Sequence, residues 1–161
     1  MSGNIKSAFG SSGQAITVTM ASLTNTSQRA STVVDNSSND YQDALVMIGV
    51  KSASSSTSSS GVLNVYAYGT ANGGTNYTEG ATGSDAAITL TVPPNARLIG
   101  QINVVANSTT YYGGPFSVAA AFGGVLPDHW GIIVENKSGA TLDATEGNHL
   151  KVYQGIYTQY S

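Results

Sequence analysis

The 161-residue sequence contains no cysteine. Disulfides, zinc–thiolate sites, iron–sulfur clusters and a thiol nucleophile are therefore all excluded. Ionisable residues are also scarce: 6 basic and 9 acidic residues make up 9% of the chain, against roughly a quarter of an average globular protein. Six cations are too few for a dedicated electrostatic nucleic-acid binder, which neutralises phosphates with clustered lysine and arginine.

Long apolar runs are missing as well. No stretch approaches the ~18 consecutive apolar residues that a membrane-spanning helix needs, and the longest, Ser117–Leu126, is interrupted by Gly123 and Gly124. Residues 1–13 contain no apolar segment typical of a secretory signal, so we expect a protein made in a cytoplasm without an export signal. A net charge of −3 with 40% hydrophobic residues also lies outside the range of disordered chains.

The clearest positive pattern is alternation of apolar and polar residues with a period of two. Ile16, Val18 and Met20 alternate with threonines, as in a half-buried β-strand. The same reasoning predicts strands over residues 14–20, 30–35, 41–51, 62–69, 85–92, 97–105, 115–122, 129–135 and 148–157. Val118–Phe122 is the one helix-compatible stretch, and it is only about a turn long.

Many short strands separated by glycine-rich turns indicate an all-β fold. The expected architecture is an antiparallel β-sandwich or barrel, jelly-roll-like, with about nine strands. We predict one such domain over residues 14–161, preceded by a flexible N-terminal arm, residues 1–13, that is rich in glycine and serine. Trp130, Phe116 and Phe122 are the predicted core aromatics.

The densest polar cluster lies between Asp35 and Asp43. Closely spaced oxygen ligands suit Ca²⁺, but the spacing does not match the EF-hand pattern. Asp and Asn are equally the standard turn formers, because their side chains bond their own backbone. We favour turns over a metal site in this region.

No arrangement typical of catalysis stands out. His129 and His149 are the only histidines, so Ser–His–Asp chemistry would need one of them beside a nucleophile, and no Gly-x-Ser-x-Gly motif is present. Most acidic residues lie beside Gly, Asn or Ser, which favours solvated turns over paired catalytic carboxylates. Phosphate-binding loops ending in Gly-Lys-Ser/Thr are absent. We predict no catalytic residue, no cofactor and no bound metal.

Two features are candidates for contact with a partner. Tyr111 and Tyr112 stand beside a glycine pair, where their rings would stack on a sugar, pack on a neighbouring protein, or simply pack at a strand edge. Ile5 and Phe9 are isolated apolar residues in the arm. They would dock into a neighbour or add a strand to its edge, unless they are merely two exposed apolar residues.

Blocks of sequence spread over most of residues 15–157 share one likeness. They are Thr32–Asn36, Tyr41–Leu45, Val65–Gly69, Asp85–Leu90, Arg97–Gly100, Pro115–Pro127, Trp130–Asn136 and Ser138–Asp143. Together these blocks resemble small β-rich virion structural proteins of tailed bacteriophages. The resemblance implies an accessory component of the particle, in capsid decoration, neck or tail, with no catalytic residue.

The leading hypothesis is therefore a non-enzymatic virion structural protein that binds other virion proteins. We expect a homo-oligomer or a symmetric assembly, no nucleic-acid or membrane partner, and location in the virion after assembly in the host cytoplasm. The alternative is a carbohydrate-binding β-sandwich for host attachment, suggested by Tyr111 and Tyr112. A glycan-active enzyme ranks third.

Overall fold

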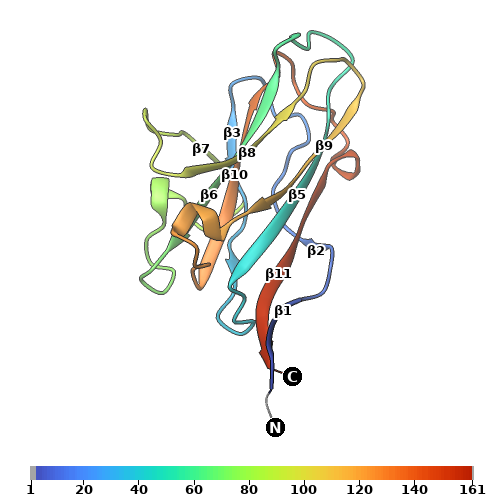
Figure 1. Cartoon of the computed structure of the whole chain (residues 1–161). Helices are drawn as coiled ribbons and strands as arrows, with labels where there is room; N and C mark the ends of the chain where they lie inside the picture. The colour runs from blue at the N-terminus through green and yellow to red at the C-terminus, as the bar shows by residue number, and fades with distance from the viewer. Residues whose placement is uncertain (1–2, 161) are drawn as a thin grey trace.

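Two antiparallel β-sheets pack face to face in the computed structural model, which describes residues 3–160 (Figure 1). Every strand pair within them is antiparallel. The all-β antiparallel fold, a sandwich or barrel, that the period-2 pattern predicts is confirmed. Within the described residues, no helix is long and apolar enough to span a membrane.

The first sheet, sheet A, has the order β1-β11-β5-β9, with β2 also paired to β11. Its strands are β1 (Ile5–Phe9), β2 (Gln14–Ala15), β5 (Asp43–Lys51), β9 (Thr110–Ser117) and β11 (Leu150–Tyr160). Sheet B has the order β7-β3-β10-β6-β8, with β4 on β10. Its strands are β3 (Gln28–Ala30), β4 (Val34–Asp35), β6 (Val62–Thr70), β7 (Ala86–Ile88), β8 (Arg97–Asn103) and β10 (His129–Lys137). Three short 3₁₀ helices complete the described chain: η1 (Thr78–Gly80), η2 (Ala119–Phe122) and η3 (Glu146–Asn148).

The main hydrophobic core fills the space between the sheets. Trp130 on β10 is fully buried and meets the ring of Tyr153 on β11 edge to face, with ring centroids 5.2 Å apart. This contact joins the two sheets directly, and such aromatic pairs add to the stabilisation from burial alone. Phe116 and Phe122 pack against the same core from its margin and are only partly buried.

The central strands of sheet B, β6 and β10, are buried on both of their faces. A second cluster on the outer side of this sheet brings Tyr66, Tyr68 and Ile133 against residues of the segment 71–96, including Tyr77, whose ring lies edge to face with that of Tyr68. This cover explains why β6 and β10 are buried almost without interruption. Sheet A differs, because buried and more accessible residues alternate along most of β5. Its outer face is left accessible.

Several strand predictions differ from the structure. Residues 5–9 of the arm, expected to be flexible, form β1 and pair with β11. The reason is that β11 runs on to Tyr160, beyond the predicted end at residue 157, and offers its backbone to the arm. In place of the predicted strand at 30–35 the structure has β3, which ends at Ala30, and the two-residue β4. Together with β1, this gives the described chain eleven strands rather than about nine.

In the segment 14–20 the predicted residues are buried, but most of the segment is not paired with another strand. Ile16, Val18 and Met20 are buried as the alternation requires, yet only the first two residues of the segment form a strand. The backbone N–H of Met20 donates instead to the Glu146 carboxylate at 2.9 Å, and that of Thr19 donates to Asp85. Carboxylates thus replace a neighbouring strand here.

Strand β9 begins earlier than predicted, at Thr110 instead of residue 115. Gly113 and Gly114 hide its alternation, and the pairing with β5 shifts register between Val46 and Ile48. The end of the predicted strand is η2, which agrees with the single helix-compatible turn seen in the sequence.

Candidate interaction surface

The outer face of sheet A is built from alternate residues of its strands. On β5, Ala44, Val46 and Ile48 are buried in the core, so Leu45 and Met47 point outward. Met47 lies opposite Val152 of β11, and its side chain is 40% exposed. The row of Met47 therefore places Met47, Val152 and Ala15 next to one another across the strands, whereas Leu45 lies between Gln154 and Ser117 in the next row.

Tyr112 lies on this face at the β9 edge. It is opposite Gly49 of β5, which is in turn opposite Leu150 of β11. A Cβ at Gly49 would lie 2.7 Å from the Tyr112 ring, so the glycine makes room for the ring to lie close to the sheet. The ring is 64% exposed and presents a flat apolar surface to solvent.

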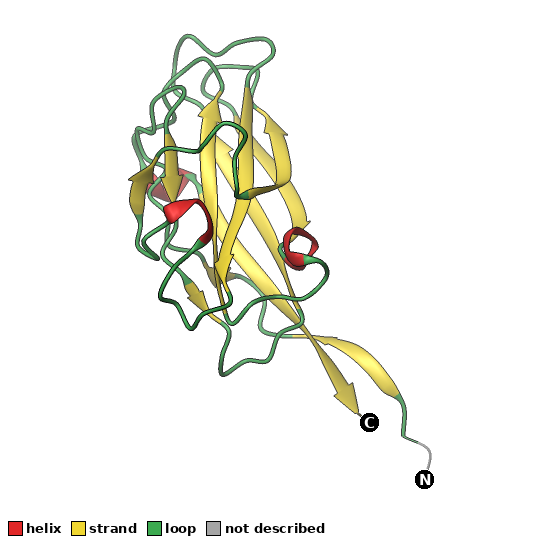
Figure 2. Cartoon of the chain, turned by 90° about the vertical axis from the view of Figure 1, so that its left-hand side faces the viewer, coloured by secondary structure: helices red, strands yellow, loops and turns green. Residues whose placement is uncertain are grey.

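The face continues onto a two-stranded ribbon, which we define as residues 5–9 of β1 with residues 156–160 of β11. The pairing of β5 with β11 ends at Ile156, whereas β1 pairs with β11 as far as Tyr160. Figures 1 and 2 show this ribbon extending beyond the rest of the sandwich, with both chain ends at the same pole. Ile5, Phe9 and Tyr160 share its outward face and are 75%, 59% and 70% exposed.

The surface has few charges. Its outward-facing residues are Ile5, Ser7, Phe9, Ala15, Asp43, Leu45, Met47, Gly49, Lys51, Thr110, Tyr112, Ser117, Leu150, Val152, Gln154, Ile156, Thr158 and Tyr160. Asp43 and Lys51 lie at the two ends of β5, where Asp43 accepts the Ser117 hydroxyl at 2.7 Å and Lys51 pairs with Asp143 at 3.5 Å. Contiguous exposed apolar surface of this kind marks interaction sites in soluble proteins.

The predicted contact residues do not all lie on the same face of sheet A. Ile5, Phe9 and Tyr112 all belong to the outer face of sheet A. Tyr111 does not, because it lies opposite the buried Val50 and packs on the core. Adjacent residues of a strand point to opposite faces, so the two tyrosines do not form one platform.

Sequence reasoning missed the centre of the surface, which contains Met47, Val152 and Leu150. The sequence predicts a strand over residues 41–51 but not which of its faces is open. The alternation of these residues is compatible with one buried and one open face, but nothing local distinguishes an open apolar face from a covered one. The distinction depends on whether a remote segment covers the sheet, as residues 71–96 cover sheet B.

The Asp35–Asp43 region forms turns, as the sequence analysis favoured. The Asp35 carboxylate accepts the N–H of Ser37 at 2.8 Å, which is the bonding of an Asx turn. Asn36 is buried and binds both the N–H and the C=O of Tyr41 through its amide. Across residues 3–160, no three His, Asp or Glu side chains gather as a metal-binding group.

The two histidines lie in structural surroundings. His149 is buried between the end of β5 and the loop that joins β10 to β11: its Nδ1 accepts the Lys51 N–H at 3.3 Å, and its Nε2 lies 3.0 Å from the Asp143 carbonyl oxygen. With the Nε2 proton donated to that carbonyl, both ring nitrogens are used. His129 lies 3.9 Å from the Asp35 carboxylate.

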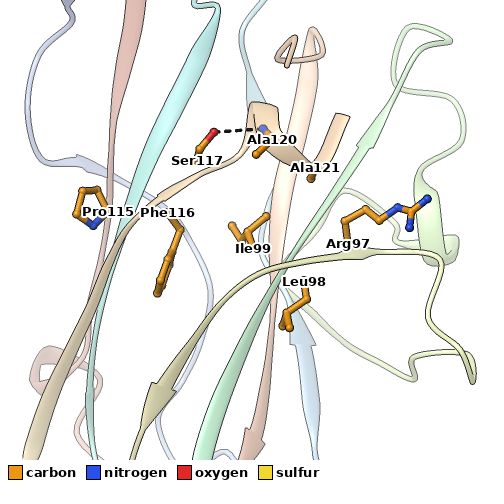
Figure 3. Close-up of a pocket in the computed structure, with 8 residues that line it drawn as sticks. All are labelled: Arg97, Leu98, Ile99, Pro115, Phe116, Ser117, Ala120 and Ala121. Carbon is orange, nitrogen blue, oxygen red and sulfur yellow. Dashed lines mark hydrogen bonds between the residues drawn. The ribbon is translucent and has the colours of Figure 1, made fainter. Parts of the chain in front are cut away.

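A cavity of about 590 Å³ opens where the edge strands β8 and β9 diverge beside η2 (Figure 3). Ile99, Phe116 and Ala121 are among the residues that line it, and Arg97 is the one ionisable residue of the lining. The Ser117 hydroxyl donates to Asp43 and accepts the Ala120 N–H at 3.2 Å, so it is engaged in holding η2. The carboxylate beside this serine, Asp43, also accepts the N–H of Ala119 at 2.8 Å, so it too holds η2 in place.

The three glutamates accept hydrogen bonds from other segments of the chain. Glu135, 4% exposed on the outer side of sheet B, accepts hydrogen bonds from Asn64 at 2.7 Å and from Gln28 and Tyr66 at 3.1 Å. Burial alone would raise the pKa of this carboxyl group, but the hydrogen bonds outweigh burial and lower the pKa below the ordinary 4.5. Glu79 and Glu146 have lowered pKa values for the same combination of causes.

Acid is therefore expected to destabilise the protein. A carboxyl group with a lowered folded-state pKa stabilises the fold at pH values above its unfolded pKa, and this contribution is lost as the pH falls through the folded value. We predict that the free energy of unfolding in urea is level near neutrality and falls below about pH 4.5. Glu135→Gln should lose about 1–3 kcal/mol at pH 7 and show a weaker acid dependence. A free energy of unfolding that stays constant from pH 6 to pH 3 would contradict this.

No protein-family model matches the chain, and no curated protein matches it. The outer face of sheet A, with the ribbon, is its most informative functional feature.

Proposed function

We propose that this protein is a non-enzymatic structural component of a tailed-bacteriophage virion, a capsid decoration, neck or tail protein. It binds other virion proteins, and copies of itself, through the outer face of sheet A and the ribbon. It needs no cofactor and takes neither nucleic acid nor membrane as a partner. Assembly takes place in the host cytoplasm, and the virion is the final location.

Two independent observations support the proposal. The virion class rests on the blocks of sequence that resemble small phage structural proteins. The assembly role rests on one observation above all, the apolar and nearly uncharged outer face of sheet A that extends onto a projecting ribbon. Interface cores are typically enriched in aromatic residues and methionine and depleted of charge, and Tyr112, Met47 and Phe9 fit that composition.

The ribbon itself argues for a partner. A two-stranded ribbon is marginally stable in water unless a further strand or a packed face supports it. Burying Ile5, Phe9 and Tyr160 would contribute roughly 1.5–3 kcal/mol each. Association costs about 4–15 kcal/mol in lost freedom, so these residues suffice only together with the central part of the face.

The first test is the composition of purified particles of the phage that encodes the chain. Mass spectrometry should detect the protein at a fixed copy ratio to the major capsid or tail protein. Particles that lack it would refute the virion assignment.

Removal of residues 1–13 is expected to weaken assembly while the sandwich stays folded. The deletion removes β1 and its two apolar side chains but leaves β2 and the core intact. Thermal melting and co-sedimentation with particles should be measured for the full and shortened chains, with Ile5→Ser/Phe9→Ser as a variant that keeps the arm. Unchanged co-sedimentation would reject the docking role, and a collapsed melting temperature would assign the arm to the folding core.

The second candidate is carbohydrate binding, favoured by the open Tyr112 ring beside Gly49. Because Tyr111 packs on the core, a single aromatic ring is presented rather than a pair. A glycan array with no binding above background, for the wild type and for Tyr112→Ala alike, would remove this candidate.

A further inference from the structure

The outer edge of β1 carries free backbone groups. The N–H of Gly10 donates to the C=O of Gly155 at 2.8 Å, which fixes the phase of the pairing between β1 and β11. In an antiparallel pair, alternate residues direct both backbone groups toward the partner strand. Lys6, Ala8 and Gly10 therefore face β11, and the N–H and C=O groups of Ile5, Ser7 and Phe9 point away from it.

Two other bonds confirm this phase. The backbone C=O of Lys151 in β11 accepts the N–H of Ile16 at 2.9 Å on the β2 side. The backbone C=O of Ile156 accepts the N–H of Gln42 at 2.7 Å on the β5 side. Odd-numbered residues of β11 thus direct their backbone N–H and C=O groups toward β1 and β2, and even-numbered residues direct theirs toward β5. Within residues 3–160, no strand pairs with the outer edge of β1.

We infer that a second copy of this chain occupies that edge, with the two β1 strands antiparallel about a two-fold axis at Ser7. In this register Ser7 faces the partner's Ser7, and Ile5 faces the partner's Phe9. Each of these facing pairs exchanges two backbone hydrogen bonds, because the free groups of both strands belong to the same residues. The two copies of sheet A then form one continuous sheet.

The side chains are self-complementary in this register. Ile5, Ser7 and Phe9 share one face, so the apolar side chains of one copy meet those of the other. Lys6 is the only charged residue of the ribbon, and it faces the partner's Ala8 rather than the partner's lysine. Like charges directly opposite one another, which would oppose pairing, are avoided.

The opposite edge of the ribbon, formed by β11, has fewer free backbone groups for pairing. On the other side of the ribbon, only Thr158 and Tyr160 of β11 direct free backbone groups outward beyond the end of β5. Pairing of β1 with that edge would be shorter and head-to-tail, whereas the two-fold contact uses the same edge on both copies and closes as a dimer. This inference deepens the proposed function and rests on it, because it names the partner of the ribbon.

Proline at Ser7 tests the pairing directly. The Ser7 N–H points away from β11, and proline is tolerated on an edge strand at such positions. Ser7→Pro should therefore keep β1 on β11 but raise the dimer dissociation constant by roughly tenfold or more, while Ser7→Ala dimerises as the wild type. Sedimentation equilibrium on purified protein, without particles, measures both. A monomeric wild type, or a Ser7→Pro dimer of unchanged affinity, would overturn the inference and leave the particle assignment untouched.

Cross-linking gives a second readout, which the absence of cysteine makes unambiguous. Facing residues of a hydrogen-bonded pair have Cα atoms about 5.5 Å apart, within the disulfide range of about 4.4–6.8 Å. Ser7→Cys should form a covalent dimer under mild oxidation. Ile5→Cys should not, because the two copies of residue 5 lie about 13 Å apart along the strands. Equal cross-linking of both variants, or none in either, would contradict the register.

Discussion

Met47→Glu is expected to abolish binding to the assembled particle while leaving the protein folded. Met47 lies near the middle of the outer face, between Leu45 and Gly49 along β5 and opposite Val152. In the free protein a carboxylate at this partly exposed position stays hydrated, so the free energy of unfolding should change by no more than about 1 kcal/mol. In an interface the same carboxylate loses water and gains no partner, which costs several kcal/mol.

The loss of affinity should exceed about 100-fold, which corresponds to nearly 3 kcal/mol. Met47→Gln is the matched control, because it has the same length and shape without the charge, and it should bind far better than Met47→Glu. Val92→Glu, on the exposed loop over sheet B, should bind as the wild type. Co-sedimentation titrations with particles lacking the protein measure all three. Equal binding by Met47→Glu and the wild type would remove the outer face from the assembly.

The largest effect on folding is expected at Trp130. Its ring is fully buried and joins sheet B to sheet A through the edge-to-face contact with Tyr153. Trp130→Ala removes this contact and leaves a cavity in a close-packed core, which costs about 3–5 kcal/mol. A domain with a total stability of about 5–15 kcal/mol would lose a large part of it.

Comparing the free energies of unfolding in urea of Trp130→Ala and Tyr112→Ala shows whether the loss comes from removing a buried ring or from removing any aromatic ring. Tyr112 is open to solvent, so its truncation should change the free energy of unfolding by no more than about 0.5 kcal/mol. Trp130→Phe should fall between the two. A loss below 1 kcal/mol for Trp130→Ala would mean that the two sheets are held together elsewhere.

Much of the sandwich was predictable because period-2 alternation is a local property. It assigned Ile16, Val18 and Met20 to the core even though most of that segment lacks a strand partner. It also placed strands close to β5, β6, β8 and β10. These strands bury one or both faces against the rest of the protein, so their apolar residues mark them as strands in the sequence.

What the sequence could not predict depends on remote contacts. The arm has a weak local pattern, and its strand exists because β11, about 150 residues away in the chain, extends beside it. The open face of sheet A was equally hidden, since Met47 and Val152 look like core residues until the cover of each sheet is known. Tyr111 and Tyr112 look like a pair in sequence, but the pleat of β9 separates them.

A reconstruction of the virion at side-chain resolution tests the central claim most directly. The account predicts that density from a neighbouring virion protein, or from a second copy, covers the outer face of sheet A around Met47 and Tyr112 and continues along the ribbon. A particle in which this face is bathed in solvent, while the chain is held through the loops over sheet B, would contradict it.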